Sequence, residues 1–271
     1  MLNLSVAIPD SSLIDESSKE DKTRKVSIIA RACAIFSVNQ IFVYKDGNKN
    51  KNDSILLTTL LKYLETPQYF RKQLFPKMQL LKFVGVLHPL KIPNHVTTSN
   101  QKMLKIGDVR DALVVRYKGK KFLDIGINKL IPYFGKESVA TRITVQIKAV
   151  NPKFLIKEIS REQTKKYWGY KVKEKSNLFT LLSSWDGEII LTSKNGKTFT
   201  GSNIKKYNQL NKSILVVFGS PERGIDKILN ENLKKIQNAS TFNFFPNQAT
   251  ETVRLEEAIL GTLSSLNILS Q

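Results

Sequence analysis

The feature that most constrains the fold is a change in the spacing of apolar residues along the chain. Up to about residue 85, short apolar strands alternate with segments whose apolar residues recur every three or four positions, as in amphipathic helices. Residues 86–150 instead contain short alternating runs separated by glycine and proline, and the strand-and-helix rhythm returns after Asn151 and Pro152. The pattern predicts an α/β domain made of residues 1–85 and 151–271, with a small β-barrel inserted at 86–150.

The expected elements follow from the same spacing together with capping and turn residues. Strands are expected at 4–10, 40–44, 112–117, 121–126, 141–147, 167–172, 188–192, 213–218 and 240–243. Helices are expected from Lys22 onward, at 55–64 with Ser54 as the cap, and at 68–74, 221–236 and 252–269.

The chain carries a large excess of basic residues. It has 43 Lys and Arg against 23 Asp and Glu, which gives a formal net charge of +20. Such an excess favours a polyanionic partner, because each phosphate contact releases condensed counterions. Composition does not separate RNA from DNA, and general solubility or a lysine-rich proteome also produces basic chains. No helix-turn-helix pattern or zinc-finger spacing supports a DNA-binding regulator.

Several sequence features that mark membrane, secreted or metal-binding proteins are missing. No run of about 18 apolar residues predicts a membrane span, and no basic segment followed by an apolar stretch predicts a secretory signal. Cys33 is the single cysteine, which excludes an internal disulfide and a cysteine-rich zinc site. His88 and His95 have no carboxylate or thiol at ligand spacing, so no metal site is predicted. We expect a cytoplasmic protein.

The first candidate site is a loop between a strand and a helix. The segment VVFGSPERGI (216–225) runs from an apolar strand into glycine, a turn and Pro221 at the helix start. Glycine after a strand lets a ligand approach the backbone, and free amide groups at a helix start bind polar atoms. The lysine and the serine or threonine of a phosphate loop are missing. By itself the segment is equally consistent with an ordinary strand-to-helix turn.

The second candidate site is the segment FNFFPNQATETVRLEEA (242–258). Its strand ends in a loop rich in Asn, Gln and Thr, and a helix is expected to begin near Thr252. Glu256 lies about one turn inside that helix, where a carboxylate is favourable, so helix capping is the simpler explanation for Glu256 and Glu257. Arg254 is placed against this preference, beside uncharged residues able to line a pocket.

Together these segments resemble a known family. GSPERGI and NFFPNQATETVRLEEA resemble the two knot-forming motifs of the SPOUT superfamily of RNA methyltransferases. Further segments are similar to the archaeal and eukaryotic group whose SPOUT domain carries an inserted OB-like barrel, namely YLETPQYFRK (63–72), LHPLKIPNH (87–95) and YWGY (167–170). They span nearly the whole chain in the right order. The resemblance implies an α/β fold of the SPOUT α/β-knot type, with a deep C-terminal trefoil knot and an inserted OB-like β-barrel.

The resemblance also implies S-adenosyl-L-methionine as cofactor, bent and cradled by backbone groups of the knot loops. The sulfonium already makes the methyl group electrophilic, so the protein has to align the acceptor and ease removal of its proton. Thr192 and Ser193 would border the pocket. Its two walls would be formed by Gly219, Ser220, Pro221, Gly224 and Ile225, and by Asn243, Phe244, Phe245, Pro246, Gln248, Thr252 and Val253.

By the same resemblance, catalysis would centre on Arg254 and Glu256. Arg254 would stabilise charge on a deprotonating base, and Glu256 would orient that arginine. The string VRLEEA (253–258) is similar to the ending of bacterial rRNA uridine-N3 methyltransferases of the superfamily, which indicates uridine N3 as the acceptor. Ribosomal RNA is the expected substrate, and transfer RNA is the second candidate.

Basic and aromatic side chains are the candidates for RNA contact. Arg31 is placed like an arginine that SPOUT enzymes turn toward RNA, although a surface ion pair explains it equally well. The other predicted RNA-binding residues are Arg71, Lys118, Lys120 and Lys121. Tyr167 and Trp168 are able to stack on bases, and burial would explain them at least as well.

The assembly and the activity complete the set of expectations. SPOUT relatives complete their active site across a two-fold interface, which implies a homodimer. The expected last helix fits one buried stripe and a second stripe facing a partner, with apolar positions at Val253, Ile259, Leu260, Leu263 and Leu266. The alternative to an enzyme is an RNA-binding protein that keeps the fold without turnover. The intact loops favour the enzyme, because a pure binder needs no cofactor pocket.

Overall fold

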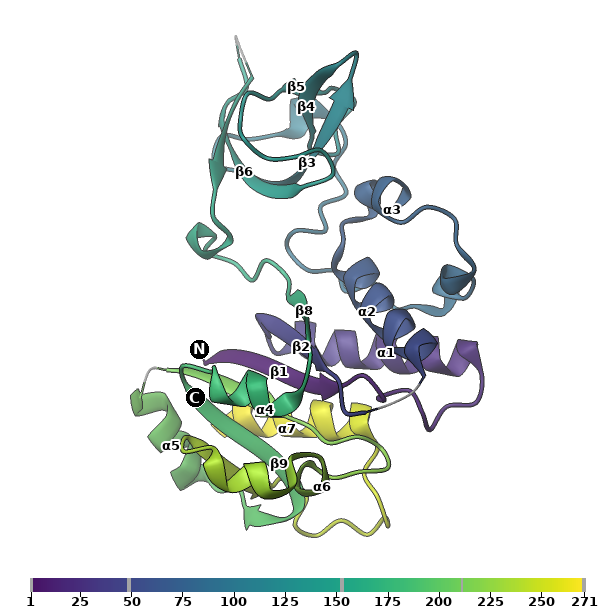
Figure 1. The fold of residues 1–271 in the computed structure, drawn as a ribbon. Coiled ribbons are helices and arrows are strands. Elements are labelled where there is room, and N and C mark those ends of the chain that lie inside the picture. The colour runs from purple at the N-terminus through teal and green to yellow at the C-terminus, as the bar shows by residue number, and fades with distance from the viewer. Residues whose placement is uncertain (1, 48–49, 152–153, 211, 270–271) are drawn as a thin grey trace. The chain divides into compact units, whose positions relative to one another are not determined.

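The computed structural model describes residues 2–47, 50–151, 154–210 and 212–269, which form two compact units (Figure 1). The first unit comprises Met1–Glu65, Gln79–Leu90 and Tyr170–Gln271, and the second comprises Thr66–Met78 and Lys91–Gly169. The expected α/β class is confirmed by the alternation of strands and helices in the first unit. None of the described helices combines the length and apolar character needed to cross a membrane.

The first unit is built on a six-stranded sheet in which every neighbouring pair is parallel, in the order β11-β9-β10-β1-β2-β8. Its strands are β1 (Asn3–Pro9), β2 (Gln40–Tyr44), β8 (Lys171–Lys175), β9 (Glu188–Thr198), β10 (Ser213–Val217) and β11 (Ala239–Asn243). Central strands such as β1 and β10 are almost continuously apolar, because a parallel sheet covered on both faces buries both sets of side chains. The expected strand at 167–172 was placed too early, since β8 begins at Lys171, after Gly169 adopts a φ of 81°.

Helices cover this sheet, and their ends explain several differences from the expected elements. They are α1 (Lys19–Ile35), α2 (Lys51–Glu65), α4 (Leu178–Ser183), α5 (Gly201–Leu210), α6 (Ile225–Leu229) and α7 (Leu255–Leu269), with short 3-10 helices at Gln79–Leu81, Val84–Val86 and Asn230–Lys235. The Ser18 side chain caps α1 by accepting from the Asp21 backbone N–H at 3.0 Å. Ser54 lies inside α2 and does not cap it. The helix expected at 221–236 ends at Leu229, because Asn230 adopts a φ of 48° and a 3-10 turn follows.

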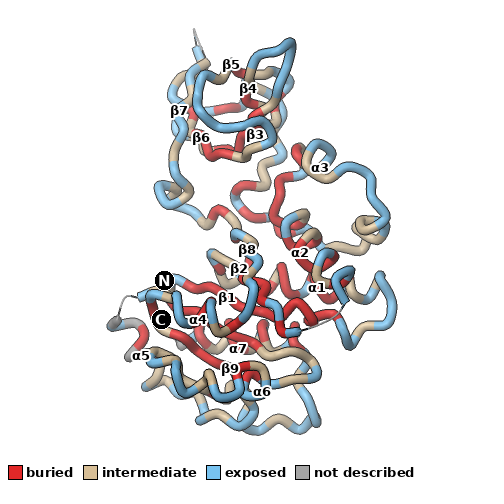
Figure 2. The backbone as a smooth tube through the Cα atoms, viewed as in Figure 1, coloured by how far each residue is buried: buried red, intermediate tan, exposed pale blue. Residues whose placement is uncertain are grey.

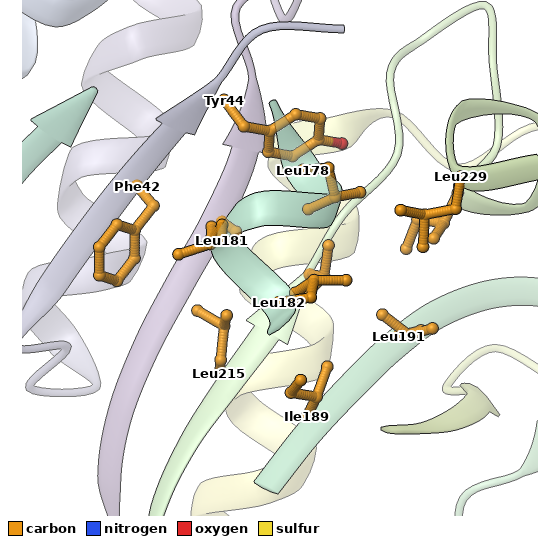
Figure 3. Packing of buried hydrophobic residues seen from close by; sticks show 12 residues of the cluster. Phe42, Tyr44, Leu178, Leu181, Leu182, Ile189, Leu191, Leu215 and Leu229 are labelled. Carbon is orange, nitrogen blue, oxygen red and sulfur yellow. The ribbon is translucent and has the colours of Figure 1, made fainter. Parts of the chain in front are cut away.

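Apolar side chains hold the first unit together (Figure 3), and the buried stretches of its backbone follow the sheet and the helices packed on it (Figure 2). On one face, α4 and α6 pack on Phe42 and other buried side chains of the sheet, and the Phe42 and Trp185 rings meet edge to face at 5.8 Å. On the other side of the sheet lies α7, which packs against α1. Cys33 is fully buried in α1, and burial raises the pKa of its thiol to about 12. Burial of each large apolar side chain, such as a leucine or a phenylalanine, stabilises the fold by roughly 1.5–3 kcal/mol.

The second unit contains a curled five-stranded antiparallel sheet in the order β5-β4-β3-β6-β7. Its strands are β3 (Val109–Tyr117), β4 (Lys120–Asp124), β5 (Ile131–Pro132), β6 (Arg142–Ala149) and β7 (Leu155–Ile159), accompanied by α3 (Gln68–Leu74) and by 3-10 turns at Gln101–Met103 and Arg161–Gln163. β3 and β4 form a hairpin, and Lys118 and Gly119 between them both adopt positive φ, as a two-residue turn of this hand requires. β7 continues the sheet past residue 150.

The carboxylate of Asp111 ties irregular segments of the second unit to its sheet. Asp111 is fully buried on β3. Its oxygens accept from Trp168 Nε1 at 2.8 Å, from Thr144 Oγ1 at 3.3 Å and from Asn94 Nδ2 at 3.3 Å, and Arg142 Nε lies 3.5 Å away. A buried carboxylate is tolerated only with such partners. The side chain of Trp168 is thereby fixed in a loop, outside any strand.

Candidate functional site

A cavity of about 760 Å³ lies in the first unit, beside β9 and the loops that follow β10 and β11. In parallel α/β sheets, ligands bind beside the carboxyl ends of the strands, and this volume is in the usual range of roughly 300–1,000 Å³ for small-molecule sites. The predicted cofactor residues that line it are Thr192, Ser193, Gly219, Ser220, Pro221, Gly224, Asn243, Phe244, Phe245, Gln248, Thr252 and Val253. Both candidate loops therefore face one cavity.

Two predicted cofactor residues lie elsewhere, and other residues join the cavity. Ile225 is 1% exposed and packs in the apolar core under α4, and Pro246 is not part of the lining. The lining residues that sequence reasoning missed are Asp15, Lys194, Asn195, Phe218, Asp226, Lys227, Phe242, Glu251, Leu255, Ala258 and Thr262. Most of these adjoin predicted positions, so widening the motifs would have found them. Asp15 and Thr262 belong to distant segments and carry no local signal.

The loop after β10 is a closed turn that requires a glycine. Ser220 N–H donates to the Arg223 carbonyl at 2.8 Å, and Arg223 N–H donates to Ser220 Oγ at 2.9 Å. A Cβ on Gly219 would lie 2.9 Å from the Arg223 carbonyl oxygen, so a side chain there would force the turn open. The Arg223 guanidinium pairs with the Asp46 carboxylate at 3.0 Å. The turn is thus anchored to the loop that follows β2.

A buried pair of carboxyl groups lies beneath this anchor. Ser11 Oγ donates to Asp46 Oδ2 at 2.6 Å, and Asp46 N–H donates to Asp10 Oδ1 at 3.2 Å. Burial raises the pKa of Asp10 to about 6, and the neighbouring Asp46 carboxyl adds to the effect. Asp10 therefore holds its proton more tightly than an exposed aspartate would.

The loop between β11 and α7 is held by its own amide side chains. Asn243 Nδ2 donates to the Lys194 carbonyl at 2.9 Å, and Asn243 Oδ1 accepts from Phe245 N–H at 2.8 Å. Gln248 Nε2 reaches the Glu251 carbonyl at 3.2 Å, which also accepts from Lys194 Nζ at 3.2 Å. These bonds join the loop after β11 to the β9 segment, so two walls of the cavity are held to each other.

Thr262 places an unsatisfied hydroxyl in the cavity wall. Its side chain lies on α7, it is 1% exposed, and it lines the cavity. Its Oγ1 makes no hydrogen bond within the described chain. A buried hydroxyl without a partner is costly, so its position beside a cavity points to a polar group of a ligand as the missing partner.

Arg254 lines the cavity and Glu256 does not. Arg254 precedes α7, its backbone N–H donates to Glu257 Oε2 at 2.9 Å, and its Nη1 lies 3.3 Å from Glu16 Oε1. Glu256 is buried, with Oε2 3.3 Å from Lys25 Nζ. The carboxylate in a position to orient Arg254 is therefore that of Glu16, which had no signal in the sequence.

A buried lysine links the cavity wall to α7. Lys25 has a side chain that is 1% exposed, and its Nζ contacts the two Asp15 carboxylate oxygens at 2.5 and 2.6 Å. The same Nζ forms the ion pair with Glu256. One cation thus lies between two carboxylates, and the Asp15 carboxylate is fixed where it faces the cavity.

The predicted RNA-binding residues are distributed over both units. Arg31 Nη1 donates to the Pro89 carbonyl at 2.7 Å, and Arg71 Nε donates to the Thr66 carbonyl at 3.0 Å. Lys121 Nζ donates to the Glu137 carbonyl at 2.8 Å, whereas Lys118 and Lys120 are exposed at the hairpin. Each of the first three is thus held by a backbone carbonyl.

The histidines show no metal-binding arrangement. His88 N–H donates to Ser27 Oγ at 2.9 Å, and His95 N–H donates to the Ile92 carbonyl at 2.8 Å. Within the part of the chain that the structure describes, no three His, Cys, Asp or Glu side chains gather to hold a metal ion.

A parallel α/β sheet with a ligand-sized cavity at the carboxyl ends of β10 and β11 has the form of a cofactor-binding enzyme domain. The family described as "Putative RNA methyltransferase" matches residues 3–266. The chain is 31% identical to the 28S rRNA (uridine-N(3))-methyltransferase of Homo sapiens, over 97% of this chain and 77% of that protein. It is 30% identical to the enzyme of the same name in Mus musculus, over 97% and 75%, and 26% identical to an uncharacterized protein of Halobacterium salinarum, over 97% and 98%. The chain belongs to this RNA methyltransferase family.

Proposed function

We propose that the chain transfers a methyl group from S-adenosyl-L-methionine to N3 of a uridine in ribosomal RNA. The observation that carries the proposal is the single cavity lined by both candidate loops, with Arg254 in its wall. The relatives named 28S rRNA (uridine-N(3))-methyltransferase supply the acceptor atom and the substrate class. The proposal includes a SPOUT α/β-knot for the first unit and an OB-like barrel for the second.

The residues present fit S-adenosyl-L-methionine. The cofactor has an adenine, a ribose and a charged amino-acid end, and each needs polar partners. The unsatisfied Thr262 hydroxyl, the amide side chain of Gln248 and the backbone of the turn at Gly219 are suited to hold them. When bound, the cofactor supplies the electrophilic methyl group. The chain itself binds and orients both reactants.

Arg254 is the residue proposed to act on the acceptor. Uridine N3 carries a proton between two carbonyl groups, and loss of that proton spreads negative charge onto both oxygens. A guanidinium in the cavity wall is able to stabilise this charge through two parallel N–H donors. Glu16, at 3.3 Å, would hold the guanidinium in place, and Glu256 would act at a distance through Lys25.

Asp15 is the proposed acceptor of the N3 proton. Its carboxylate lines the cavity and is 28% exposed, so a proton it receives has a route to solvent. Asp15 would accept the proton that leaves N3, and the bound cofactor would supply the methyl group that takes its place. Lys25 keeps the carboxylate oriented toward the cavity. Sequence reasoning assigned no base, because nothing near Asp15 in the sequence marks it.

The test combines cofactor binding and product analysis. Calorimetry should detect binding of S-adenosyl-L-methionine to the purified protein. When rRNA from a strain that lacks the gene for this protein is incubated with the protein and S-adenosyl-L-methionine, mass spectrometry should detect new 3-methyluridine. Cofactor binding without transfer to any rRNA would contradict the proposed substrate, whereas the second candidate, an RNA-binding protein that keeps the fold, predicts no cofactor binding. Absence of cofactor binding would overturn the proposal.

We also propose a homodimer. The buried stripe expected on the last helix is confirmed, since Ile259, Leu263 and Leu266 are fully buried, whereas Leu260 and Ile268 of α7 are 42% and 65% exposed. On the neighbouring α1, the exposed apolar residues include Ile28 and Ile35. A two-fold contact through these helices would cover them. Light scattering that shows a stable monomer at micromolar concentration would contradict the dimer.

A further inference from the structure

A second cavity, of about 790 Å³, lies within the second unit. It is bordered by the start of β3, by β6 and β7, and by the irregular segments 91–98 and 163–168. Its floor includes Trp168 and Arg110, both buried. Arg110 donates to the carbonyls of Ile125 at 3.1 Å and Thr98 at 2.6 Å, so the floor is held rigidly by bonds to the backbone. We refer to this cavity as the lysine groove.

The rim of the lysine groove is strongly basic. Its exposed cations are Lys91, Lys148, Lys157, Lys165 and Lys166. Asp108 is the acidic side chain among the described lining residues, and its Oδ2 is engaged by the Lys105 N–H at 2.8 Å. Several lysines around one concave surface create a field that attracts a polyanion.

The groove also offers apolar surface between these lysines. Val96, Met103 and Ile159 line it, and Met103 is 66% exposed. A surface that contacted only the phosphates of a duplex would gain little from exposed apolar side chains. Unpaired bases, in contrast, stack on apolar and aromatic side chains while their phosphates meet basic residues.

We propose that the lysine groove binds an unpaired segment of RNA, with phosphates at the lysine rim and bases against the apolar side chains that line the groove. The inference rests on the proposed function for the identity of the polyanion. It moves the main RNA contact of this unit away from the predicted lysines of the β3–β4 hairpin. Val109 and Tyr117 are opposite ends of β3, so the groove and the hairpin are separated by about 25 Å of strand.

The hairpin provides a matched control in the full-length chain. Lys157→Glu with Lys166→Glu reverses two charges in the groove, and Lys118→Glu with Lys120→Glu reverses two at the hairpin. The probe is a fluorescein-labelled, uridine-rich single-stranded oligoribonucleotide of about 12 nucleotides. This length lies within the range of about 4–16 nucleotides that one OB-type module binds. Fluorescence anisotropy at several KCl concentrations measures the affinity, with a duplex of equal length for comparison.

The groove variant should bind the single strand at least about tenfold more weakly, and its salt slope should fall by about 1.4, or about 0.7 for each lost phosphate contact. The hairpin variant should lose less than about threefold. Met103→Ser should weaken single-strand binding without changing the salt slope, because it removes apolar contact and no charge. Circular dichroism and cofactor affinity should match the unaltered chain in all variants.

Equal losses in the groove and hairpin variants would overturn the proposal, because overall charge would then explain binding. So would tighter binding of the duplex than of the single strand, or unchanged affinity of the Met103→Ser variant. These readouts do not involve methyl transfer. A chain that binds the oligoribonucleotide through the groove but lacks cofactor binding would contradict the proposed function and leave the groove assignment standing.

Discussion

Arg254 Nη1 lies 3.3 Å from Glu16 Oε1, so the loop that follows β1 contacts the residue that precedes α7. The adjacent Asp15 pairs with the buried Lys25 of α1, which in turn lies 3.3 Å from Glu256. The loop is therefore held at two consecutive carboxylates. This arrangement places a cation, Arg254, and an anion, Asp15, in the wall of the same cavity.

Arg254→Ala should lower methyl transfer by roughly a hundredfold, the scale seen when one charge-stabilising donor is removed. The fold should lose less than about 1 kcal/mol, because the Arg254 side chain is 60% exposed and surface ion pairs contribute little. Cofactor affinity should stay nearly constant. Arg254→Lys should recover little of the rate if two-pronged geometry matters. Single-turnover methylation measures these rates. Glu16→Gln should lower the rate less than Arg254→Ala does. A wild-type rate for Arg254→Ala would show that Arg254 only caps the helix or forms an ion pair.

Asp15→Asn should change the pH dependence of methyl transfer as well as its rate. With the carboxylate present, the protein itself removes the N3 proton, so the rate should depend little on pH. Without it, transfer depends on uridine that has ionised by itself, so the rate should rise about tenfold per pH unit while that fraction is small. Single-turnover rates from pH 6 to 9 test this. Parallel profiles for the two proteins would show that Asp15 only anchors Lys25.

Thr262→Val should weaken cofactor binding by roughly 5- to 10-fold, because the cofactor would lose one hydrogen bond of about 1 kcal/mol. The free protein should keep its free energy of unfolding or gain slightly, since the buried hydroxyl has no partner within the described chain. Calorimetric titration with S-adenosyl-L-methionine and urea unfolding measure the two quantities. Unchanged affinity would place the cofactor away from α7, and a clear loss of stability would show that the hydroxyl is satisfied in the free protein.

Asp10 should make stability depend on pH between about 4 and 6. Burial raises its pKa from 3.8 to about 6, so the folded chain binds this proton more tightly than the unfolded chain. Stability from that proton is fully present below pH 3.8 and is lost as pH rises through 6. The asparagine of Asp10→Asn does not titrate, so the variant keeps its stability as the pH rises. The difference in free energy of unfolding between the variant and the wild type should therefore increase by about 1–3 kcal/mol from pH 4 to pH 7.5, in favour of the variant. Urea unfolding at both pH values tests it, and a constant difference would contradict the raised pKa.

Much of the fold was accessible from local sequence patterns. The strand Gln40–Tyr44 and the helix Gln68–Leu74 have the bounds that apolar spacing and turn residues predicted. Both elements follow from the spacing of apolar residues and from the residues at their ends, which are properties of a short stretch of sequence. The two candidate loops do line one cavity of the first unit, and both were found because a run of specific residues is read from the sequence directly.

The assignment of partners within the site depended on tertiary structure. The family resemblance implied Glu256 as the partner of Arg254, but the fold brings Glu16 to Arg254 and Lys25 to Glu256. Ile225 follows the glycine turn in sequence, yet its side chain points into the core. Asp15 and Thr262 meet at one cavity from opposite ends of the chain. Local patterns determine which residues form strands, helices and turns, whereas pairing of charges and lining of cavities follow from long-range packing, which brings together segments that share no sequence signal.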